Sequence, residues 1–400
     1  MDKFKYIKDF ESLGFGVFVH FGLYSIVQKG EWYKGIYGVS DEEYVKLKDK
    51  FKVKKNWAKE LVSIAKKSGA KYINLGTRHH DGFSLFDTCG LNDFDAPHSA
   101  CGRDLVKEFV DECNRQGMVP FLYHTLLDWY NKDFYNDFPK YLEYLRKSVE
   151  ILCTKYGKIG GFWFDGKWAR PDDDWQEDEL YGLIRKYQPE AIIINNTGLS
   201  ERGKTGHKEI DSVTFERGKP VFVDRSQKPI AGEMCQTLTD HWGNALNDFN
   251  YKSVGSLIED LADCRAAGCN FILNIGVRKD GSVKPIEAGY FNEIGKWIKF
   301  NKNFIYGAKP VDDVSADGAQ ILYDGNYYYA LIKNVGMTAD PNVAINSETG
   351  SVVVHSDKKM TNATWLDNGK RIKTKNNSFK IEPFFYGNSG VVRVARFKLI

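Results

Sequence analysis

Eight short apolar runs alternate with longer stretches in which apolar residues recur at helical spacing. Most of the runs are continuously apolar, a pattern typical of parallel strands that are buried on both faces. Between them, stretches such as 56–69, 104–116 and 138–157 place their apolar residues on one helical face. The eight runs are 15–21, 70–76, 118–124, 161–165, 191–196, 212–216, 233–238 and 269–276.

This alternation predicts an α/β fold in which eight parallel strands close into a (β/α)8, TIM-like barrel. No helical pattern separates the fifth, sixth and seventh runs, so we expect the helices after strands five and six to be missing. After about residue 308 the pattern changes to short β-type runs broken by Asp-Gly, Asn-Gly and Asn-Asn turns. We therefore predict a catalytic barrel domain over 1–308 and a C-terminal antiparallel β-sandwich over 309–400.

The charge balance argues against partners that bind through a strong electrostatic field. Lysine and arginine number 56 against 53 aspartates and glutamates, which gives a formal net charge of +3. We therefore expect no binding to nucleic acid or to a membrane. The charged N-terminal stretch lacks the apolar segment of a secretory signal, and the seven cysteines form no Cys-x-x-Cys pair. Both features predict a cytoplasmic protein with reduced thiols.

Residues able to do chemistry gather at the predicted strand ends, where barrel enzymes place their active sites. A purely structural barrel would not require several histidines and carboxylates at one end. Aromatic residues, 14% of the chain, also offer platforms for the C–H face of sugar rings. The strand-end positions are His20, Arg78, His79, His80, Asp81, Tyr123, His124, Asp165, Asn195, Asn196, Glu216, Glu233 and Asn274.

Asp165 ends the run GFWFD and is followed by a glycine. A carboxylate at a strand tip suits the nucleophile of a glycosidase, and the alternative is a cap for the segment that follows. Retaining glycosidases hold a second carboxyl group, protonated at rest, about 5–5.5 Å from the nucleophile. Glu216, at the end of the sixth run, and Glu233, which opens the seventh, are the candidates. Position favours Glu216, although a pairing with Arg217 would argue for an ionised Glu216.

The histidines allow a second interpretation, as ligands of a transition metal. His20, His79 and a carboxylate would form such a set. Against it, His79 and His80 are adjacent, so on a strand their side chains would point to opposite sides. Imidazoles can instead form hydrogen bonds with the hydroxyl groups of a sugar. The residues alone leave both interpretations open.

Several of these segments together resemble the α-L-fucosidases of glycoside hydrolase family 29. The resemblance runs from about residue 10 to 306 and rests on FGVFVHFGLYS, EWY, TRHHDGF, LYHTLLDWY, GFWFDG and FILNIGVRKDGSV, in that order. It implies an α-L-fucosidase that cleaves by double displacement with retention, without a cofactor or a metal. The implied substrates are fucosylated oligosaccharides or aryl and alkyl fucosides.

The resemblance also implies roles for single residues. Asp165 matches the family nucleophile, and Glu216 lies where one branch of the family carries its acid/base, with Glu233 as the second candidate. The positions that match sugar-binding residues are His20, Glu31, Trp32, His79, His80, His124 and Trp163. Two other classes of function stay open, a metal-dependent barrel hydrolase and a fucose-binding protein without activity.

Overall fold

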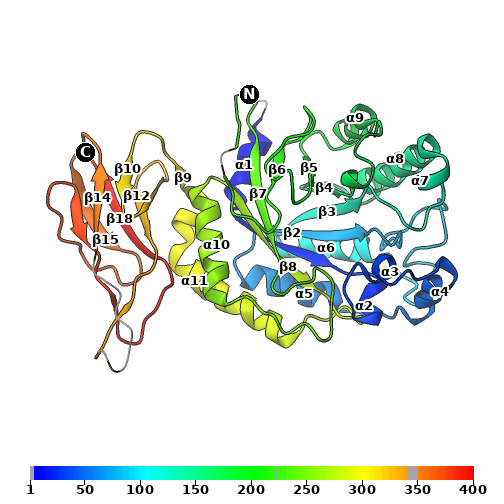
Figure 1. Cartoon of the computed structure of the whole chain (residues 1–400), viewed down its shortest axis with the longest axis horizontal. Coiled ribbons are helices and arrows are strands. Elements are labelled where there is room, and N and C mark those ends of the chain that lie inside the picture. The colour runs from blue at the N-terminus through cyan, green and yellow to red at the C-terminus, as the bar shows by residue number, and fades with distance from the viewer. Residues whose placement is uncertain (1–3, 222, 227, 341, 343–349) are drawn as a thin grey trace.

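The structure is a computed structural model that describes residues 4–221, 223–226, 228–340, 342 and 350–400. Its larger part is a closed barrel of eight parallel strands in sequence order, with the eighth strand paired to the first (Figure 1). This confirms the predicted barrel. The strands are β1 (Phe15–His20), β2 (Tyr72–Arg78), β3 (Val119–Thr125), β4 (Gly161–Asp165), β5 (Ile192–Asn195), β6 (Ser212–Thr214), β7 (Ala231–Gln236) and β8 (Asn270–Gly276).

Helices surround the barrel, but the described parts of the two connections between β5 and β7 contain none, as predicted. The α-helices are α1 (Lys5–Leu13), α2 (Tyr24–Val27), α3 (Tyr33–Ile36), α4 (Asp41–Val45), α5 (Trp57–Lys67), α6 (Leu105–Gln116), α7 (Asp133–Asn136), α8 (Phe138–Lys155), α9 (Glu177–Tyr187), α10 (Val254–Ala266) and α11 (Pro285–Gly307). The described residues also form the 3-10 helices η1 (Lys46–Lys50) and η2 (Lys167–Ala169). None of the described helices has the length and apolar content needed to cross a membrane.

Local sequence signals set the ends of the outer helices. The Asp104 side chain accepts a hydrogen bond from the backbone N–H of Lys107 and so caps α6, which ends at Gly117 in the left-handed conformation. Ser253 caps α10 in the same way through the N–H of Ser256. The N-terminal caps lie where the chain enters these helices after β2 and β7.

The strand side chains divide into an outer set, packed against the helices, and an inner set that fills the barrel. The inner set is rich in aromatic rings, including those of Phe18, Tyr123 and Trp163. Helix α1, which the apolar pattern did not predict, closes the N-terminal end of the barrel. Its Phe10 ring lies 5.5 Å from Tyr72, the first residue of β2. A closed bottom leaves the carboxyl ends of the strands as the open end.

The seventh strand begins earlier than its apolar run. We predicted a strand from Glu233, but β7 begins at Ala231, because Ala231 and Gly232 pair with Ser212 and Val213 of β6. Alanine and glycine have low intrinsic strand propensity, so neighbouring strands rather than local preference recruit them. Glu233 therefore lies in the middle of the strand and not at its start.

The C-terminal region forms antiparallel sheets beyond α10 and α11 (Figure 1). A five-stranded sheet, β15-β18-β12-β11-β9, and a three-stranded sheet, β10-β14-β16, share one apolar core. The pair β13 and β17 is parallel, which differs from the antiparallel pattern that we predicted. The strands are β9 (Lys309–Pro310), β10 (Ser315–Asp317), β11 (Gln320–Tyr323), β12 (Tyr328–Ile332), β13 (Met337–Thr338), β14 (Ser351–His355), β15 (Met360–Trp365), β16 (Ser378–Lys380), β17 (Phe384–Phe385) and β18 (Arg393–Leu399).

Candidate active site

A pocket of about 640 Å³ lies where the carboxyl ends of the barrel strands meet. Three of its rings, those of Phe18, Tyr123 and Trp163, also belong to the aromatic filling of the barrel, and we call them the aromatic floor. The pocket brings together residues that are far apart in the chain. The predicted site residues that line it are His20, Glu31, Trp32, His79, His80, Trp163, Asp165 and Glu216.

Asp165 is the last residue of β4, and donors surround its carboxylate. Oδ1 accepts hydrogen bonds from Gly166 N (2.9 Å), Trp168 Nε1 (3.1 Å) and Asn196 Nδ2 (3.2 Å). Oδ2 accepts one from Tyr123 Oη (3.2 Å). Burial would raise the pKa of Asp165, but these donors and the nearby His80 outweigh it and hold that pKa below its usual value. Asp165 is therefore ionised at neutral pH.

The glycine that follows Asp165 is required by the turn. Gly166 has φ +101°, and a Cβ there would lie 2.8 Å from the backbone nitrogen of Leu127, closer than real Cβ atoms come. Its own N–H donates to Asp165, and η2 begins without any side-chain cap. The aspartate therefore does not cap the segment that follows it, which was the alternative to a chemical role.

Glu216 lies two residues beyond β6 and faces the same pocket. Asn196 Nδ2 donates to its Oε2 (2.8 Å) as well as to Asp165, and Thr214 Oγ1 orients the amide by donating to its Oδ1 (3.1 Å). Burial and the charge of Asp165 raise the pKa of Glu216 above its usual value. The pKa values of the two carboxyl groups that share one amide are therefore shifted in opposite directions.

Arg217 does not hold Glu216 in its ionised form by pairing with it. Its Nη2 donates to the backbone carbonyl of Asp240 (2.7 Å), and its guanidinium lies 5.2 Å from the ring centre of Trp242. The pairing that argued against Glu216 in the sequence is not among the ion pairs of the described residues. Glu216 therefore remains the candidate for the second carboxyl group of a retaining glycosidase.

Four histidines line the pocket: His241 is exposed, and His20, His79 and His80 are buried. Two of the buried ones are held neutral. Burial lowers the pKa of His20 to about 4, and burial together with His80 and His20 holds the pKa of His79 well below its usual value. Asn274 Nδ2 donates to a backbone carbonyl, so its Oδ1 faces His20 and accepts from His20 Nδ1 (2.7 Å). His20 Nε2 is then an acceptor that can receive a hydrogen bond from a ligand hydroxyl.

His80 lies beside the carboxylate of Asp165. Its Nε2 is 3.5 Å from Asp165 Oδ2. Thr125 Oγ1 donates to the carbonyl of Leu127 and so accepts from His80 Nδ1 (2.7 Å). His79 and His80 line the same pocket with ring centres 4.3 Å apart, so the expectation that they point to opposite sides was wrong. β2 ends at Arg78, and strand alternation does not extend beyond it.

Loops above the strands add a hydrogen-bonded carboxylate and an aromatic wall. Glu31, 5% exposed, accepts from Gly243 N (2.7 Å) through Oε2. Trp32 lies between His80 and Trp168, with ring centres 5.4 and 5.8 Å away. Flat rings beside grouped hydrogen-bonding side chains suit a ligand that has an apolar face and several hydroxyl groups.

Comparison with known proteins agrees with this geometry. The model of the α-L-fucosidase family matches residues 1–303. The chain belongs to the α-L-fucosidase family. Among its relatives, the α-L-fucosidase of Dictyostelium discoideum is 26% identical over 337 residues, which cover 75% of this chain and 71% of that one. The tissue α-L-fucosidase of Homo sapiens is 26% identical over 333 residues, which cover 75% and 69% of the two chains.

Solved structures of α-L-fucosidases share the fold of this family member along its whole length. Isoenzyme 1 from Paenibacillus thiaminolyticus is 25% identical and matches with a TM-score of 0.84, covering 100% of both chains. A fucosidase from Bacteroides thetaiotaomicron, solved as a trapped covalent intermediate with 2-fluoro-fucosyl fluoride, is 23% identical with a TM-score of 0.84 and covers 99% and 96%. Membership of the family makes this chain a glycoside hydrolase.

Two predicted site residues do not reach the pocket of this family member. His124 is fully buried on the outer side of the barrel, where its Nδ1 lies 2.9 Å from Thr77 Oγ1 and its ring packs against Phe86. Its neighbour Tyr123 points inward instead, because successive residues of a strand face opposite sides. The assignment of His124 to substrate binding was therefore wrong. Glu233, the second candidate for the acid/base, lies inside the barrel and not among the lining residues.

Four residues that donate to Asp165 or line the pocket were not predicted to belong to the site. Tyr123 and Asn196 were noted only as strand-end residues, yet both donate to Asp165. Trp168, in the short helix η2 after β4, and Trp242, in the loop after β7, were not singled out at all. Loop positions give no periodic signal, so only the aromatic residue type close behind a strand end could have indicated them.

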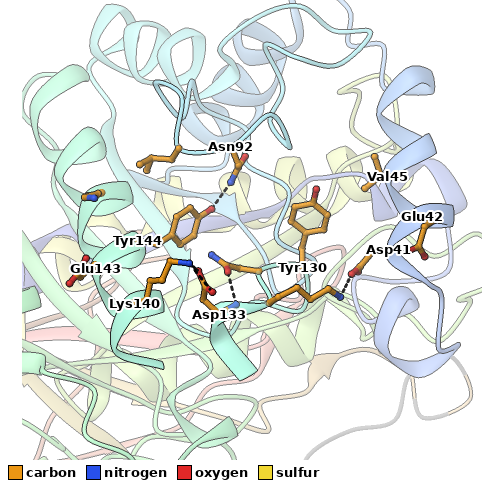
Figure 2. A pocket seen from close by; sticks show the side chains of 13 residues that line it. Asp41, Glu42, Val45, Asn92, Tyr130, Asp133, Lys140, Glu143 and Tyr144 are labelled. Atoms are coloured by element: carbon orange, nitrogen blue, oxygen red, sulfur yellow. Dashed lines mark hydrogen bonds and ion pairs between the residues drawn. The ribbon is translucent and has the colours of Figure 1, made fainter. Parts of the chain in front are cut away.

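A second pocket, of about 810 Å³, lies outside the barrel between α4, α8 and the loop after β3 (Figure 2). None of the predicted site residues lines it. Two of its lysines pair with carboxylates of the same pocket, Lys132 with Asp41 and Lys140 with Asp133. Within the described part of the chain, no group of three or more His, Cys, Asp and Glu side chains is placed to hold a metal ion. The chemistry therefore centres on the pocket at the strand ends.

Proposed function

We propose that this member of the family hydrolyses terminal α-L-fucosides with retention of configuration, by double displacement. Asp165 attacks the anomeric carbon, and the bond to the leaving oxygen breaks as Glu216 protonates that oxygen. Water then attacks the anomeric carbon and gives a proton to Glu216, and the bond between the sugar and Asp165 breaks. The substrates are fucosylated oligosaccharides or aryl and alkyl fucosides.

The shared amide of Asn196 is the observation that carries this proposal. Asp165 Oδ1 and Glu216 Oε2 both lie within hydrogen-bonding distance of one nitrogen, so they are no more than about 6 Å apart. Retaining glycosidases separate their carboxyl groups by about 5–5.5 Å, and inverting enzymes by about 6.5–9.5 Å to admit a water between them. The spacing favours attack by Asp165 itself over attack by a water.

The charge of Asp165 couples the two steps. Before attack, burial and the negative charge of Asp165 raise the pKa of Glu216, which favours the protonated form that the first step requires. Formation of the ester removes that charge, so the pKa of Glu216 falls and the group becomes a base for the second step. One residue can then serve as acid and base in turn.

The remaining pocket residues bind the sugar. His20 and His79, held neutral by burial, together with His80 and Glu31 exchange hydrogen bonds with the ring hydroxyls. Phe18 and the other rings of the aromatic floor provide an apolar surface for the C6 methyl group, which distinguishes fucose from galactose. That contact contributes only about 1–3 kcal/mol of discrimination between the two sugars, so the polar contacts contribute the larger part of the specificity.

The test is hydrolysis of an aryl α-L-fucoside, followed by NMR of the first sugar anomer released, with and without a chelator. We expect turnover in both conditions and release of α-L-fucose. Initial release of β-L-fucose would exclude double displacement. Loss of activity in the chelator would favour the metal-dependent alternative, and binding of fucose without turnover would favour a protein that only binds the sugar.

A further inference from the structure

Glu233 is a carboxyl group in the interior of the barrel that the proposed mechanism does not use. It is 1% exposed and lies on β7 between Ala231 and Cys235, both members of the inner apolar set. An ionisable group in such surroundings costs several kcal/mol unless donors compensate it. Its partners should therefore reveal why it is there.

Two donors hold this carboxyl group. Tyr72 Oη donates to Oε2 (2.5 Å), and Trp163 Nε1 donates to Oε1 (2.9 Å). Burial raises the pKa of Glu233 to about 7 despite these hydrogen bonds. The described residues place no lysine, arginine or histidine within ion-pair distance of it. The group is thus built to receive two specific N–H and O–H donors.

One of those donors is a ring of the aromatic floor. Trp163 directs Nε1 down to Glu233, while the rest of its indole lines the pocket and contacts Phe18, 5.1 Å away between ring centres. It also stacks on Tyr123 at 5.7 Å, and Tyr123 donates to Asp165. Three contacts therefore connect Glu233 to the nucleophile, and the first two involve the indole.

We propose that Glu233 is a positioning residue that fixes the Trp163 indole, and with it the aromatic floor of the sugar site, and that it exchanges no proton with the substrate. This rests on the proposed function of the pocket. The indole has one donor, and Glu233 is its acceptor from below. Without that acceptor the N–H would lie buried and unpaired, and the ring would rotate to satisfy it at the expense of its fit to the sugar.

The test is a double-mutant cycle of Glu233→Leu and Trp163→Phe, read as the inhibition constant for L-fucose and as kcat/KM on two aryl fucosides that differ in leaving group. We expect Glu233→Leu to weaken fucose binding and kcat/KM by about tenfold, equally for both leaving groups. In the Trp163→Phe background, which has no indole N–H, the same change should cost less than about twofold. Equal losses in both backgrounds would overturn the proposal.

Two further variants separate positioning from stability and from acid/base catalysis. Tyr72→Phe removes the other donor, so it should lower the melting temperature while the fucose inhibition constant stays within about twofold. Glu233→Gln keeps an acceptor for Trp163, so its kcat/KM on both substrates should lie within about threefold of the wild-type value. A loss of more than 100-fold in Glu233→Gln, confined to the poor leaving group, would make Glu233 the acid/base and overturn the proposal.

A second measurement covers the case in which Glu233→Leu does not fold. In the protein labelled with ¹⁵N-tryptophan, Trp163→Phe identifies the Trp163 indole signal among the nine tryptophans. We expect that signal to shift in Glu233→Gln and to respond to L-fucose, and a signal unmoved by Glu233→Gln would refute the link. Because fucose binding requires no turnover, this result is independent of hydrolysis. A wild type that binds fucose but cleaves no fucoside would refute the proposed function alone.

Discussion

The rim and the interior of the barrel each hold a carboxyl group, and the two groups have opposite surroundings. Asp165, at the rim, is 15% exposed and has four hydrogen-bond donors as well as His80 beside it. Glu233, in the interior, is 1% exposed and has two donors. The pKa of Asp165 lies below its usual value, whereas the pKa of Glu233 is raised to about 7.

Burial acts in the same direction on both groups, so the donors decide the difference. At the rim, strand ends and loops meet, and several N–H and O–H groups can converge on one carboxylate. Inside the barrel, the backbone groups are used by the strand pairs, and only side chains remain as donors. A charged nucleophile is therefore easier to hold at the rim, while the interior suits a group that orients its neighbours.

Removal of the rim carboxylate should have the largest effect. We expect Asp165→Gly to lower turnover by roughly 10⁴-fold or more, because the variant lacks the group that forms the covalent bond in the proposed mechanism. Added azide should restore part of the activity and give β-L-fucosyl azide, since it attacks from the vacated side. Activity of the variant near the wild-type level would refute the role of Asp165.

Loss of the second rim carboxyl group should depend on the leaving group. Glu216→Ala should lower kcat/KM by about 10²–10⁴-fold on a substrate with a poor leaving group, which needs protonation. On an activated aryl fucoside the loss should be much smaller. Glu233→Gln is the matched control, a carboxyl group removed from the interior, and should show no such dependence. The reverse pattern would exchange the roles of rim and interior.

Asn196 allows a test of the shared amide. Its hydrogen bonds lower the pKa of both Asp165 and Glu216, so Asn196→Ala should raise both. Activity requires ionised Asp165 and protonated Glu216, and the whole bell-shaped pH profile should therefore move to higher pH. We expect kcat/KM to fall by about 10–100-fold, the value of one hydrogen bond to a charged group. An unchanged pH profile would show that the amide does not set these pKa values.

Substitution of Trp168 should have the smallest effect and should move only one limb of the pH profile. Trp168→Phe removes the N–H that donates to Asp165 and keeps a ring beside Trp32. The indole is 37% exposed, so water can replace its N–H, and we expect a loss of only a few-fold. The acid limb of the pH profile, which reports the ionisation of Asp165, should move to higher pH, while the basic limb should stay where it is. A shift of both limbs would contradict separate control of the two groups.

The sequence predicted the barrel because eight continuous apolar runs, typical of buried strands, alternate with stretches whose apolar residues recur at helical spacing. It did not reveal the start of β7, since Ala231 and Gly232 join the strand only through pairing with β6. It also did not reveal α1, a short helix in a charged N-terminal stretch, whose Ile7 and Phe10 cover the barrel bottom. Both features depend on contacts between segments, which periodicity along the chain does not report.

The candidate site was predictable where a strand end determined it and less so elsewhere. His20, Asp165 and Glu216 follow apolar runs, and the structure brings them to one pocket. The resemblance assigned His124 to substrate binding, and the apolar run could not correct this, because it does not reveal which of two neighbouring residues faces inward. Trp168 lies in a segment with no periodic pattern, and its donation to Asp165 depends on a turn that only the three-dimensional structure shows.

The most direct test of the central claim is to identify the residue that bonds to the sugar. The protein would be incubated with 2-fluoro-fucosyl fluoride, digested, and analysed by mass spectrometry for the labelled peptide. We predict a single label on Asp165, formed in the Glu233→Gln variant as well and absent from Asp165→Gly. A label on Glu216, Glu233 or any other side chain would contradict the account.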